Sequence, residues 1–501
     1  MALPNELRVF YLLSPYLSRL VGIVEKDITD LLGCRYRAVQ RRKFPDVPPT
    51  EAAKQRAARA EEGRRQAMQL LPQAGIIPGF TRIDALGEEE TFDALVAGAD
   101  LITNAEFVVS DVRVHIDVLV RDADNYIPVV VSSHRVARPA KTAKQETVPT
   151  SELGIGRPVY AGWKVRNHAA DTYRLALADR ALAEYGLASG KGGAIGQDPS
   201  LTFIEPVAPL QNGLTQALET PEPTTPRRMK ECKSCRYWFD CERELVARDD
   251  ISLLLSGDSG SHYINQGITT VQQLIDANLG ESSQLARAWR KGIPVLRRND
   301  VTMARYDIEI DIDLEAYLDH GAYLWGVSDG QTYIPFVTWE PLGGEAEARN
   351  FAMFWNYLKA KLLEARTQGK SIAVYCYSNH GENYWMRSSA KRFAGYPGVP
   401  SEGEVNAFLN SPYWIDVFRE VRKQLVGPEG LGLKIVARVA GFYWEGDLDG
   451  EASVNAYRQA FNENNAEIRE QILRYNRDDC LATGAVRKWL SHGAPGIPIL
   501  H

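Results

Sequence analysis

The sequence has few cysteines, no long hydrophobic run and little net charge, and each shortage narrows what the protein can be. Its six cysteines in 501 residues are unevenly placed, which argues against disulfides and for a cytoplasmic location. No apolar run is long enough to span a membrane, and charges at Glu6, Arg8 and Arg19 argue against a signal peptide. The formal net charge of −6 excludes a global basic field, although local basic stretches can still bind phosphate.

The remaining composition is that of an ordinary globular protein. It is 45% hydrophobic and 24% charged, which suffices for sizeable cores, and the length predicts two to four domains. The last 200 residues alternate strand and helix patterns, which indicates an α/β domain. Pattern and propensity predict helices at 51–71 and 168–188, strands at 92–96, 101–109, 112–120 and 126–132, a loop at 190–196, and short helices across 250–297.

One stretch, residues 305–327, carries an unusual ladder of acids. Four aliphatic residues alternate with five acids there, and a period of two places all the acids on one face of a strand. Carboxylates on one face repel one another by roughly 1 kcal/mol per close pair even in water, unless a cation lies among them. The acids are Asp307, Glu309, Asp311, Asp313 and Glu315.

A second acidic motif comes near the end of the chain. In RYNRDDCLAT, residues 474–483, Tyr475 and Asp479 are four residues apart and share one face of a helix. An Asp-x-Glu strand and a late Tyr-x-x-x-Asp helix are the acid set of a two-metal nuclease. Two divalent cations about 4 Å apart stabilise the attacking and leaving oxygens of phosphodiester hydrolysis, and carboxylates are natural ligands for them.

This C-terminal region, about 300–492, resembles the DEDD exonucleases of the RNase H-like superfamily, in particular the YprB-like branch. The first motif of that family matches Tyr306-Asp307-Ile308-Glu309, and the pair Asp313 and Glu315 ranks second. The second motif matches YCYSNHGE, in which Glu382 replaces the usual aspartate and Asp416 is the alternative acid. The resemblance implies Mg²⁺ or Mn²⁺ as cofactor. The implied ligands are Asp307, Glu309, Glu382 (or Asp416) and Asp479, with Tyr475 orienting the water and Lys434 near the phosphate.

Four of the cysteines are a second set of candidate metal ligands. Cys232, Cys235 and Cys241 have the spacing C-x2-C-x5-C, and Cys34 is the candidate fourth thiolate. Four soft thiolates suit an iron–sulfur cluster or zinc. One early cysteine and a late triplet resemble the AddB-type iron–sulfur ligands of RecB-like nucleases, and this resemblance favours a 4Fe–4S cluster over zinc.

The resemblance to RecB-like nucleases, which have the PD-(D/E)xK fold, covers about residues 10–245. It implies Asp117 as the strand aspartate, yet Val130 and Ser132 stand where the family has Glu and Lys. Gln66 stands near where the family has a helical Glu or His, and Arg174 and Ala178 replace the Gln and Tyr of its later helix. Alternatively, a lysine displaced in the sequence, at 141, 144 or 164, would restore the missing catalytic lysine. A single carboxylate cannot hold Mg²⁺ firmly against water. The sequence therefore predicts a nuclease fold retained without hydrolysis, and basic residues at 35–43 and 56–65 are candidates for phosphate contact.

Together these features predict an α/β protein of three parts. They are a RecB-like domain with a four-cysteine cluster at 1–248, a helical connector at 249–299 that resembles a helix-hairpin-helix element, and an RNase H-like DEDD domain at 300–501. The expected function is a metal-dependent 3′–5′ exonuclease in DNA repair or end-processing, acting on single-stranded DNA or a free DNA end, with RNA still open. The alternatives are a DNA-binding scaffold with both centres impaired, or an active endonuclease in the RecB-like domain.

Overall fold

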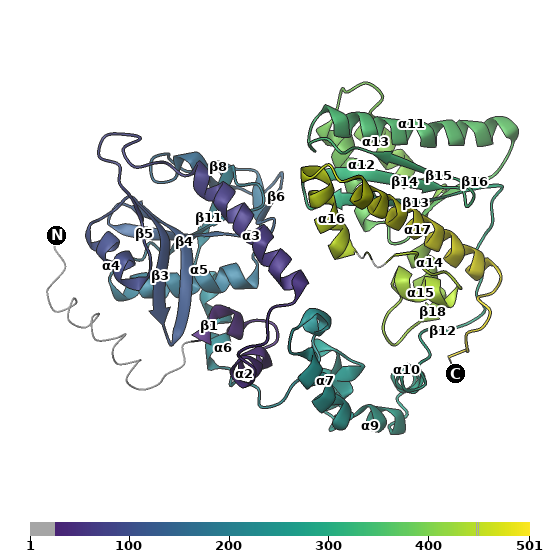
Figure 1. The fold of residues 1–501 in the computed structure, drawn as a ribbon, viewed down its shortest axis with the longest axis horizontal. Coiled ribbons are helices and arrows are strands. Elements are labelled where there is room, and N and C mark those ends of the chain that lie inside the picture. The colour runs from purple at the N-terminus through teal and green to yellow at the C-terminus, as the bar shows by residue number, and fades with distance from the viewer. Residues whose placement is uncertain (1–25, 447, 449, 501) are drawn as a thin grey trace. The chain divides into compact units, whose positions relative to one another are not determined.

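The structure, a computed structural model, describes residues 26–446, 448 and 450–500 (Figure 1). The N-terminal stretch that argues against a signal peptide lies outside these residues. The described chain divides into two compact units, Met1–Leu245 and Val246–His501. The predicted connector groups with the second unit, and the three-part boundaries stay a prediction. Within the described residues, no helix combines the length and apolar character that crossing a bilayer requires.

The first unit is built on a mixed sheet with helices on both faces. On one face α5 (Ala169–Glu184) buries Leu175 and Leu177 against the sheet, and on the other α3 (Glu51–Leu70) packs through Ala67 (Figure 1). The sheet order is β2 (Arg82–Asp84), β3 (Leu101–Val109), β4 (Val112–Asp122), β5 (Asn125–Val131), β10 (Lys191–Ile195), β11 (Leu201–Pro206), β7 (Gln145–Pro149) and β8 (Val159–Ala161), with β1 (Lys26–Asp27) beside β4.

Most predicted elements of this unit are confirmed, and two are wrong. Residues 92–96 lie in a helix, α4 (Glu88–Val96), whose first turn carries three acids that complement the positive end of the helix dipole. Residues 191–195 form strand β10 and not a loop. Its glycines are needed for close packing, since a Cβ on Gly193 would lie 2.8 Å from a methyl of Val129 on the neighbouring strand.

The second unit contains a five-stranded sheet between two helical layers (Figure 1). Its order is β15 (Tyr333–Val337), β14 (Gly321–Ser328), β13 (Ile308–Tyr317), β16 (Ile372–Cys376) and β17 (Trp414–Asp416). The first three strands are antiparallel, and β16 and β17 run parallel to β13. One helical layer is α11 (Glu345–Gln368), α12 (His380–Arg392) and α13 (Glu402–Leu409), and the other includes α14 (Val417–Gln424), α15 (Leu433–Val439), α16 (Gly450–Asn462) and α17 (Ala466–Ser491).

Strand β13 separates these layers by the alternation of its side chains. Ile308, Ile310, Ile312 and Leu314 belong to the core with α11, α12 and α13. The acids at odd positions therefore face the opposite layer, where α17 crosses β13. This confirms that the acid ladder lies on one face of a strand.

The connector forms a small helical subdomain at the start of the second unit. Its helices are α8 (Ser261–Ile264), α9 (Val271–Asp276) and α10 (Glu281–Arg290), around a core that includes Ile251, Val271 and Leu274. Thr270 caps α9, since its hydroxyl accepts a hydrogen bond from the Gln273 amide while the Gln273 side chain reaches back. Contact of this element with DNA stays a prediction.

Candidate metal centre

Three of the five acids, Asp307 just before β13 and Glu309 and Asp311 within it, are neutralised or capped by neighbouring groups. The Asp307 carboxylate is exposed and accepts hydrogen bonds from Ser371 N at 2.9 Å and Ser371 Oγ at 2.7 Å. Glu309 pairs with Arg305 at 2.9 Å and also with Arg487. Asp311 receives both Nε and Nη2 of Arg487, at 2.7 and 2.9 Å. The buried Arg487 therefore neutralises the charges of both Glu309 and Asp311, which are neighbours on the acidic face of β13.

This pairing corrects the sequence-based placement of the centre. Asp307 and Glu309, predicted as first ligands, do not lie with Asp479. Asp307 and Asp313 are six residues apart on an extended strand, which is about 20 Å at roughly 3.3 Å per residue. The sequence alone shows five acids on one face of a strand. Which of them stay free to bind a metal depends on Arg487, which comes from a helix far along the chain and pairs with Glu309 and Asp311.

The structure brings together Asp313, Glu315 and Asp479. One carboxylate oxygen from each lies within 4.8 Å of the others, and this is the only such group of ligating side chains among the described residues. Asp313 and Glu315 come from β13, just before a register shift between Glu315 and Ala316. Asp479 comes from α17, which packs across that strand. The second-ranked Asp-x-Glu pair thus occupies the place predicted for the first.

Each acid in this group is oriented by at least one neutral hydrogen-bond donor. Asn476 Nδ2 donates to Asp313 at 2.8 Å, and Ser453 Oγ donates to Glu315 at 3.0 Å. Trp444 Nε1 donates to Asp479 at 2.7 Å. Sequence reasoning missed all three donors, because none belongs to a recognisable motif. Neutral donors orient a carboxylate without cancelling its charge, so its second oxygen remains available to a cation.

Space for Asn476 depends on a glycine in the neighbouring strand. A Cβ on Gly326 of β14 would lie 1.7 Å from Asn476 Oδ1, a distance that no side chain can occupy. The same amide oxygen accepts a hydrogen bond from the Tyr333 hydroxyl at 2.8 Å. Tyr333 therefore fixes which way the amide points, and its NH₂ group is directed to Asp313.

Burial and mutual repulsion dominate the electrostatics of the three acids. Burial, and then repulsion from neighbouring carboxylates, raises the pKa of Glu315 to about 8 and the pKa of Asp313 well above its usual range. Burial raises the pKa of Asp479 to about 6. Without a cation, Asp313 and Glu315 therefore retain protons near neutral pH. An all-carboxylate donor set is the kind that hard divalent cations such as Mg²⁺ and Mn²⁺ bind.

Of the two candidates for the second-motif acid, Glu382 lies with the group. It is buried at the start of α12, its pKa is raised by burial to about 8, and its charge raises the pKa of both Asp313 and Glu315. Asp416 serves mainly as a helix cap, accepting from Ser378 N at 3.0 Å and Arg419 N at 3.3 Å. The longer glutamate therefore stands beside the cluster, and the aspartate begins α14.

Tyr475 and Lys434 also lie at this centre. The Tyr475 hydroxyl is hydrogen-bonded to Asp479, and burial raises the pKa of this phenol far above its usual value. It is therefore a proton donor here and not a base. Lys434 Nζ lies 5.2 Å from the Tyr475 ring centre and donates to Leu448 O at 2.9 Å. Its charge lowers the pKa of Asp479 and of Glu315, so it is the cation beside the cluster.

In the first unit the predicted strand aspartate is enclosed by arginines. Asp117 is buried and accepts hydrogen bonds from Arg64 Nε, Arg174 Nη2 and Val131 N, each at 2.7 Å. Burial alone would raise its pKa, but Arg174, the Val131 amide and Arg64 together lower it. Val130 is fully buried in the core. Two guanidinium groups therefore occupy the coordination space of the one carboxylate.

A cavity of about 710 Å³ lies over Asp117. Its lining includes Arg64, Glu61 and Arg174, whereas Gln66 hydrogen-bonds Glu62 and does not line it. None of the lysines at 141, 144 and 164 lines this cavity. The helix position that the sequence assigned to Gln66 is thus occupied by Glu61 and Arg64.

The four predicted cysteines come together in the first unit. Cys34 lies in the turn between a 3₁₀ turn at 28–31 and α2 (Tyr36–Lys43), and the other three lie between residues 230 and 245. Burial, and then the neighbouring thiolates, raises the pKa of Cys34, of Cys232 to about 11 and of Cys241 to about 12. Met229 N and Gln40 Nε2 donate to Cys232 and Cys241 sulfurs at 3.2 and 3.3 Å. Cys376 and Cys480 are buried elsewhere.

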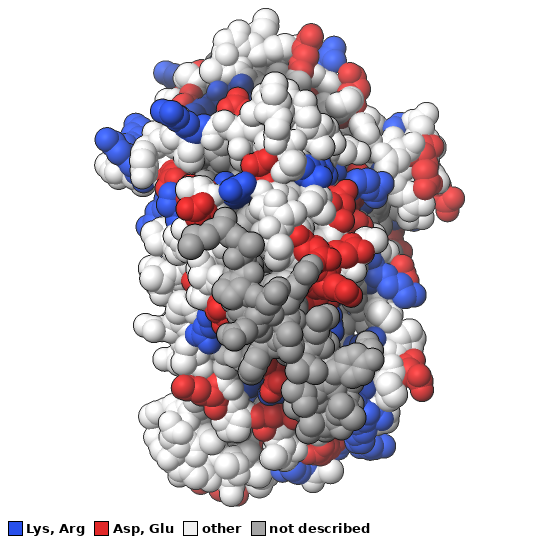
Figure 2. Space-filling view, turned by 90° about the vertical axis from the view of Figure 1, so that its left-hand side faces the viewer, with Lys and Arg blue, Asp and Glu red and all other residues white. Residues whose placement is uncertain are grey.

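The basic stretch beside Cys34 is largely engaged within the protein. Arg41 pairs with Asp30, Arg42 with Glu222 at 2.5 Å, and Lys43 with Asp240 at 2.6 Å. Arg35 and Arg37 donate to backbone carbonyls. On the face drawn in Figure 2, Lys and Arg side chains are interspersed with Asp and Glu. A phosphate would therefore compete with existing partners at these positions.

Comparison with known proteins gives a family match within the second unit. Residues 307–491 match a family model described as RNase H superfamily. No curated protein and no solved structure matches the chain. The match covers both β13 and α17, which carry the acid group. Residues 307–491 therefore form an RNase H-like domain, a fold compatible with a nuclease that acts on nucleic acid with divalent metals.

Proposed function

We propose that the protein is a metal-dependent nuclease that degrades nucleic acid from a 3′ end, with Asp313, Glu315, Glu382 and Asp479 as its metal ligands. The observation that carries this proposal is the group of three carboxylates within 4.8 Å of one another, two on buried residues and one on a half-buried residue. Burying like charges together is costly unless a cation compensates them. Mg²⁺ or Mn²⁺ held there would supply activation of water and stabilisation of the leaving oxygen.

The protein groups around the centre have separate tasks in this proposal. Asn476, Ser453 and Trp444 hold the carboxylates in place, as the outer partners of metal ligands do. The protonated Tyr475 orients a water by hydrogen bonding, and a neighbouring carboxylate accepts the proton. Lys434 supplies positive charge beside the position of the phosphate.

A cleavage assay with end-labelled single strands tests this function. In Mn²⁺ the wild type is expected to shorten a 5′-labelled DNA strand stepwise, and Asp313→Asn is expected to lose at least about a hundredfold in rate. Asp307→Asn is the matched control, because it makes the same substitution just before the strand that carries Asp313 and leaves the cluster intact. Loss of activity in Asp307→Asn with activity intact in Asp313→Asn would refute the assignment. The same assay with RNA identifies the preferred nucleic acid.

We further propose that the first unit binds nucleic acid without cutting it. The support is the pairing of Asp117 with Arg64 and Arg174, since both cations would have to leave before a metal could bind. The alternative, an active endonuclease in this unit, predicts that Asp117→Asn abolishes internal cleavage. Cleavage that persists in Asp117→Asn and disappears in Asp313→Asn supports a single active centre.

We also propose a 4Fe–4S cluster on Cys34, Cys232, Cys235 and Cys241. The donor set fits, because four thiols meet beside N–H donors to sulfur. A zinc ribbon has two close pairs of cysteines, whereas here one early cysteine joins a late triplet, which favours the iron–sulfur cluster. When bound, it would link the segment around Cys34 to the segment at 230–245.

Colour and metal content test the cluster. Anaerobically purified protein is expected to be brown with broad absorbance near roughly 400 nm. Cys232→Ser is expected to lose the colour, and Cys376→Ala is expected to keep it. Stoichiometric zinc without iron in the wild type would refute the cluster.

A further inference from the structure

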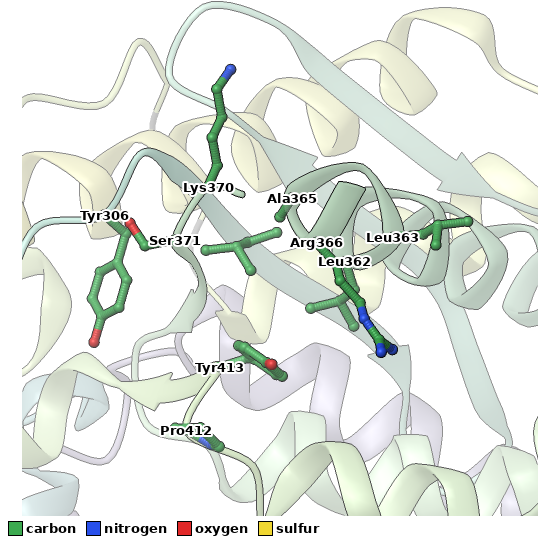
Figure 3. Close-up of a pocket in the computed structure, with 10 residues that line it drawn as sticks. Tyr306, Leu362, Leu363, Ala365, Arg366, Lys370, Ser371, Pro412 and Tyr413 are labelled. Atoms are coloured by element: carbon green, nitrogen blue, oxygen red, sulfur yellow. The ribbon is translucent and has the colours of Figure 1, made fainter. Parts of the chain in front are cut away.

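A cavity of about 540 Å³ lies at the end of the second unit's sheet where β13 and β16 begin. Its walls come from four places in the chain: Tyr306 just before β13, the last turns of α11, the start of β16 and the segment before β17 (Figure 3). Leu362, Ala365 and Ile372 supply apolar surface. The volume is in the range of roughly 300–1,000 Å³ that small-molecule sites occupy.

Two tyrosines flank this cavity. Both tyrosines line the cavity, and in the view of Figure 3 Leu362 and Arg366 are drawn beyond Tyr413, on the side away from Tyr306. Tyr306 packs edge-on against Tyr375 at 6.4 Å between ring centres, which fixes its orientation. Tyr413 is 43% exposed. An exposed aromatic face of this kind is suited to stacking with a nucleobase.

The charge around the cavity is positive. Arg366, in the last turn of α11, is exposed, and its guanidinium forms no ion pair with any of the residues that the structure describes. Lys370 also lines the rim, although Figure 3 shows its side chain extending away from both tyrosines. The carboxylates nearby are Asp307, which is held by Ser371, and Glu364, which pairs with Lys361 at 2.9 Å. The side chains that line the cavity include two cations and no acid, and Arg366 is available to an anion.

We propose that this cavity binds one unpaired nucleotide of a single strand whose end lies at the metal centre. Its base would stack on Tyr413, and its phosphate would pair with Arg366. The inference rests on the proposed nuclease function and adds a second anchor for the substrate strand. Tyr306 and Asp313 are seven positions apart along extended chain, about 23 Å at roughly 3.3 Å per residue. A strand of several nucleotides spans that distance, and shorter ones do not.

Length-dependent binding without catalysis tests this anchor. The full chain is titrated in EDTA against fluorescent single-stranded DNA of 12 and of 4 nucleotides. Tyr413→Ala and Arg366→Ala are expected to weaken binding of the longer strand at least about fivefold and to leave the shorter strand unchanged. Tyr413→Phe, which keeps the ring, and Arg419→Ala, which removes an exposed arginine elsewhere in the unit, are expected to bind as the wild type.

The outcomes separate this inference from the proposed function. Unchanged binding of the 12-nucleotide strand by both variants overturns the anchor, while Mn²⁺-dependent cleavage lost in Asp313→Asn still supports the nuclease. Competition by free dAMP as strong as that by the long strand also overturns it, because the cavity would then bind free nucleotides. Thermal melting of the variants checks that they fold, and both changed side chains are solvent-exposed.

Discussion

Replacing Asp313 by asparagine is expected to stabilise the metal-free protein and to abolish its response to divalent cations. The ligating oxygens of Asp313, Glu315 and Asp479 lie within 4.8 Å of one another. Unit charges at such a distance repel by about 3–4 kcal/mol when the effective dielectric constant is about 20. One neutral amide removes two of the three repulsive pairs.

The expected gain is smaller than the full repulsion, because protons already relieve part of it. Burial and repulsion raise the pKa of Glu315 to about 8, so at pH 8 the centre of the metal-free protein is only partly ionised. We expect Asp313→Asn to gain about 1–3 kcal/mol at this pH, or about 2–4 °C in Tm for each kcal/mol. In the wild type, Mn²⁺ at a hundred times its Kd is expected to contribute about 2.7 kcal/mol, and in the variant this shift disappears.

Thermal melting at pH 8, in chelator and in Mn²⁺, measures both effects. Asp307→Asn is the control, since its carboxylate is exposed and lies away from the group; it is expected to keep the Mn²⁺ shift. A lower Tm for metal-free Asp313→Asn, together with a full Mn²⁺ shift, would show that the carboxylates do not share a cation.

Three further predictions follow from the same region. Arg487→Met is expected to destabilise the protein by about 3–5 kcal/mol in urea unfolding, since it leaves buried carboxylates without their cation; a loss below about 1 kcal/mol would contradict this. Trp444→Phe is expected to lower Mn²⁺ affinity about 10–100-fold with little change in Tm, because it removes the donor to Asp479; calorimetric titration decides this. In chelator, Tm is expected to fall as the pH rises from about 4.5 to about 8. In the folded state Glu315 and Glu382 have pKa values raised to about 8. Between about pH 4.5 and about pH 8 they therefore keep protons that the same two side chains lose in the unfolded chain, and this stabilisation of the folded state is lost as the pH rises. Excess Mn²⁺ is expected to reverse that fall at pH 8, and a Tm that rises with pH in chelator would refute the reasoning.

The sequence by itself determined the α/β class and the strands at 101–109 and 112–120, because hydrophobic periodicity is a local property. It also identified the late helix that carries Tyr475 and Asp479. The alternation of acids and aliphatic residues from 307 to 315 predicted one acidic face, and β13 has that face.

Only the tertiary structure decided which acids on that face form the centre. The family motif ranked Asp307 and Glu309 first among the five acids, whereas in the structure the acids are distinguished by what α17 brings opposite each of them. Arg487 lies opposite Asp311 and neutralises it, whereas Asn476 and Asp479 lie two to three turns earlier on the helix, beside Asp313. The register of a helix against a strand depends on packing across the whole interface, including the glycine at 326 that admits Asn476. No local pattern contains that information.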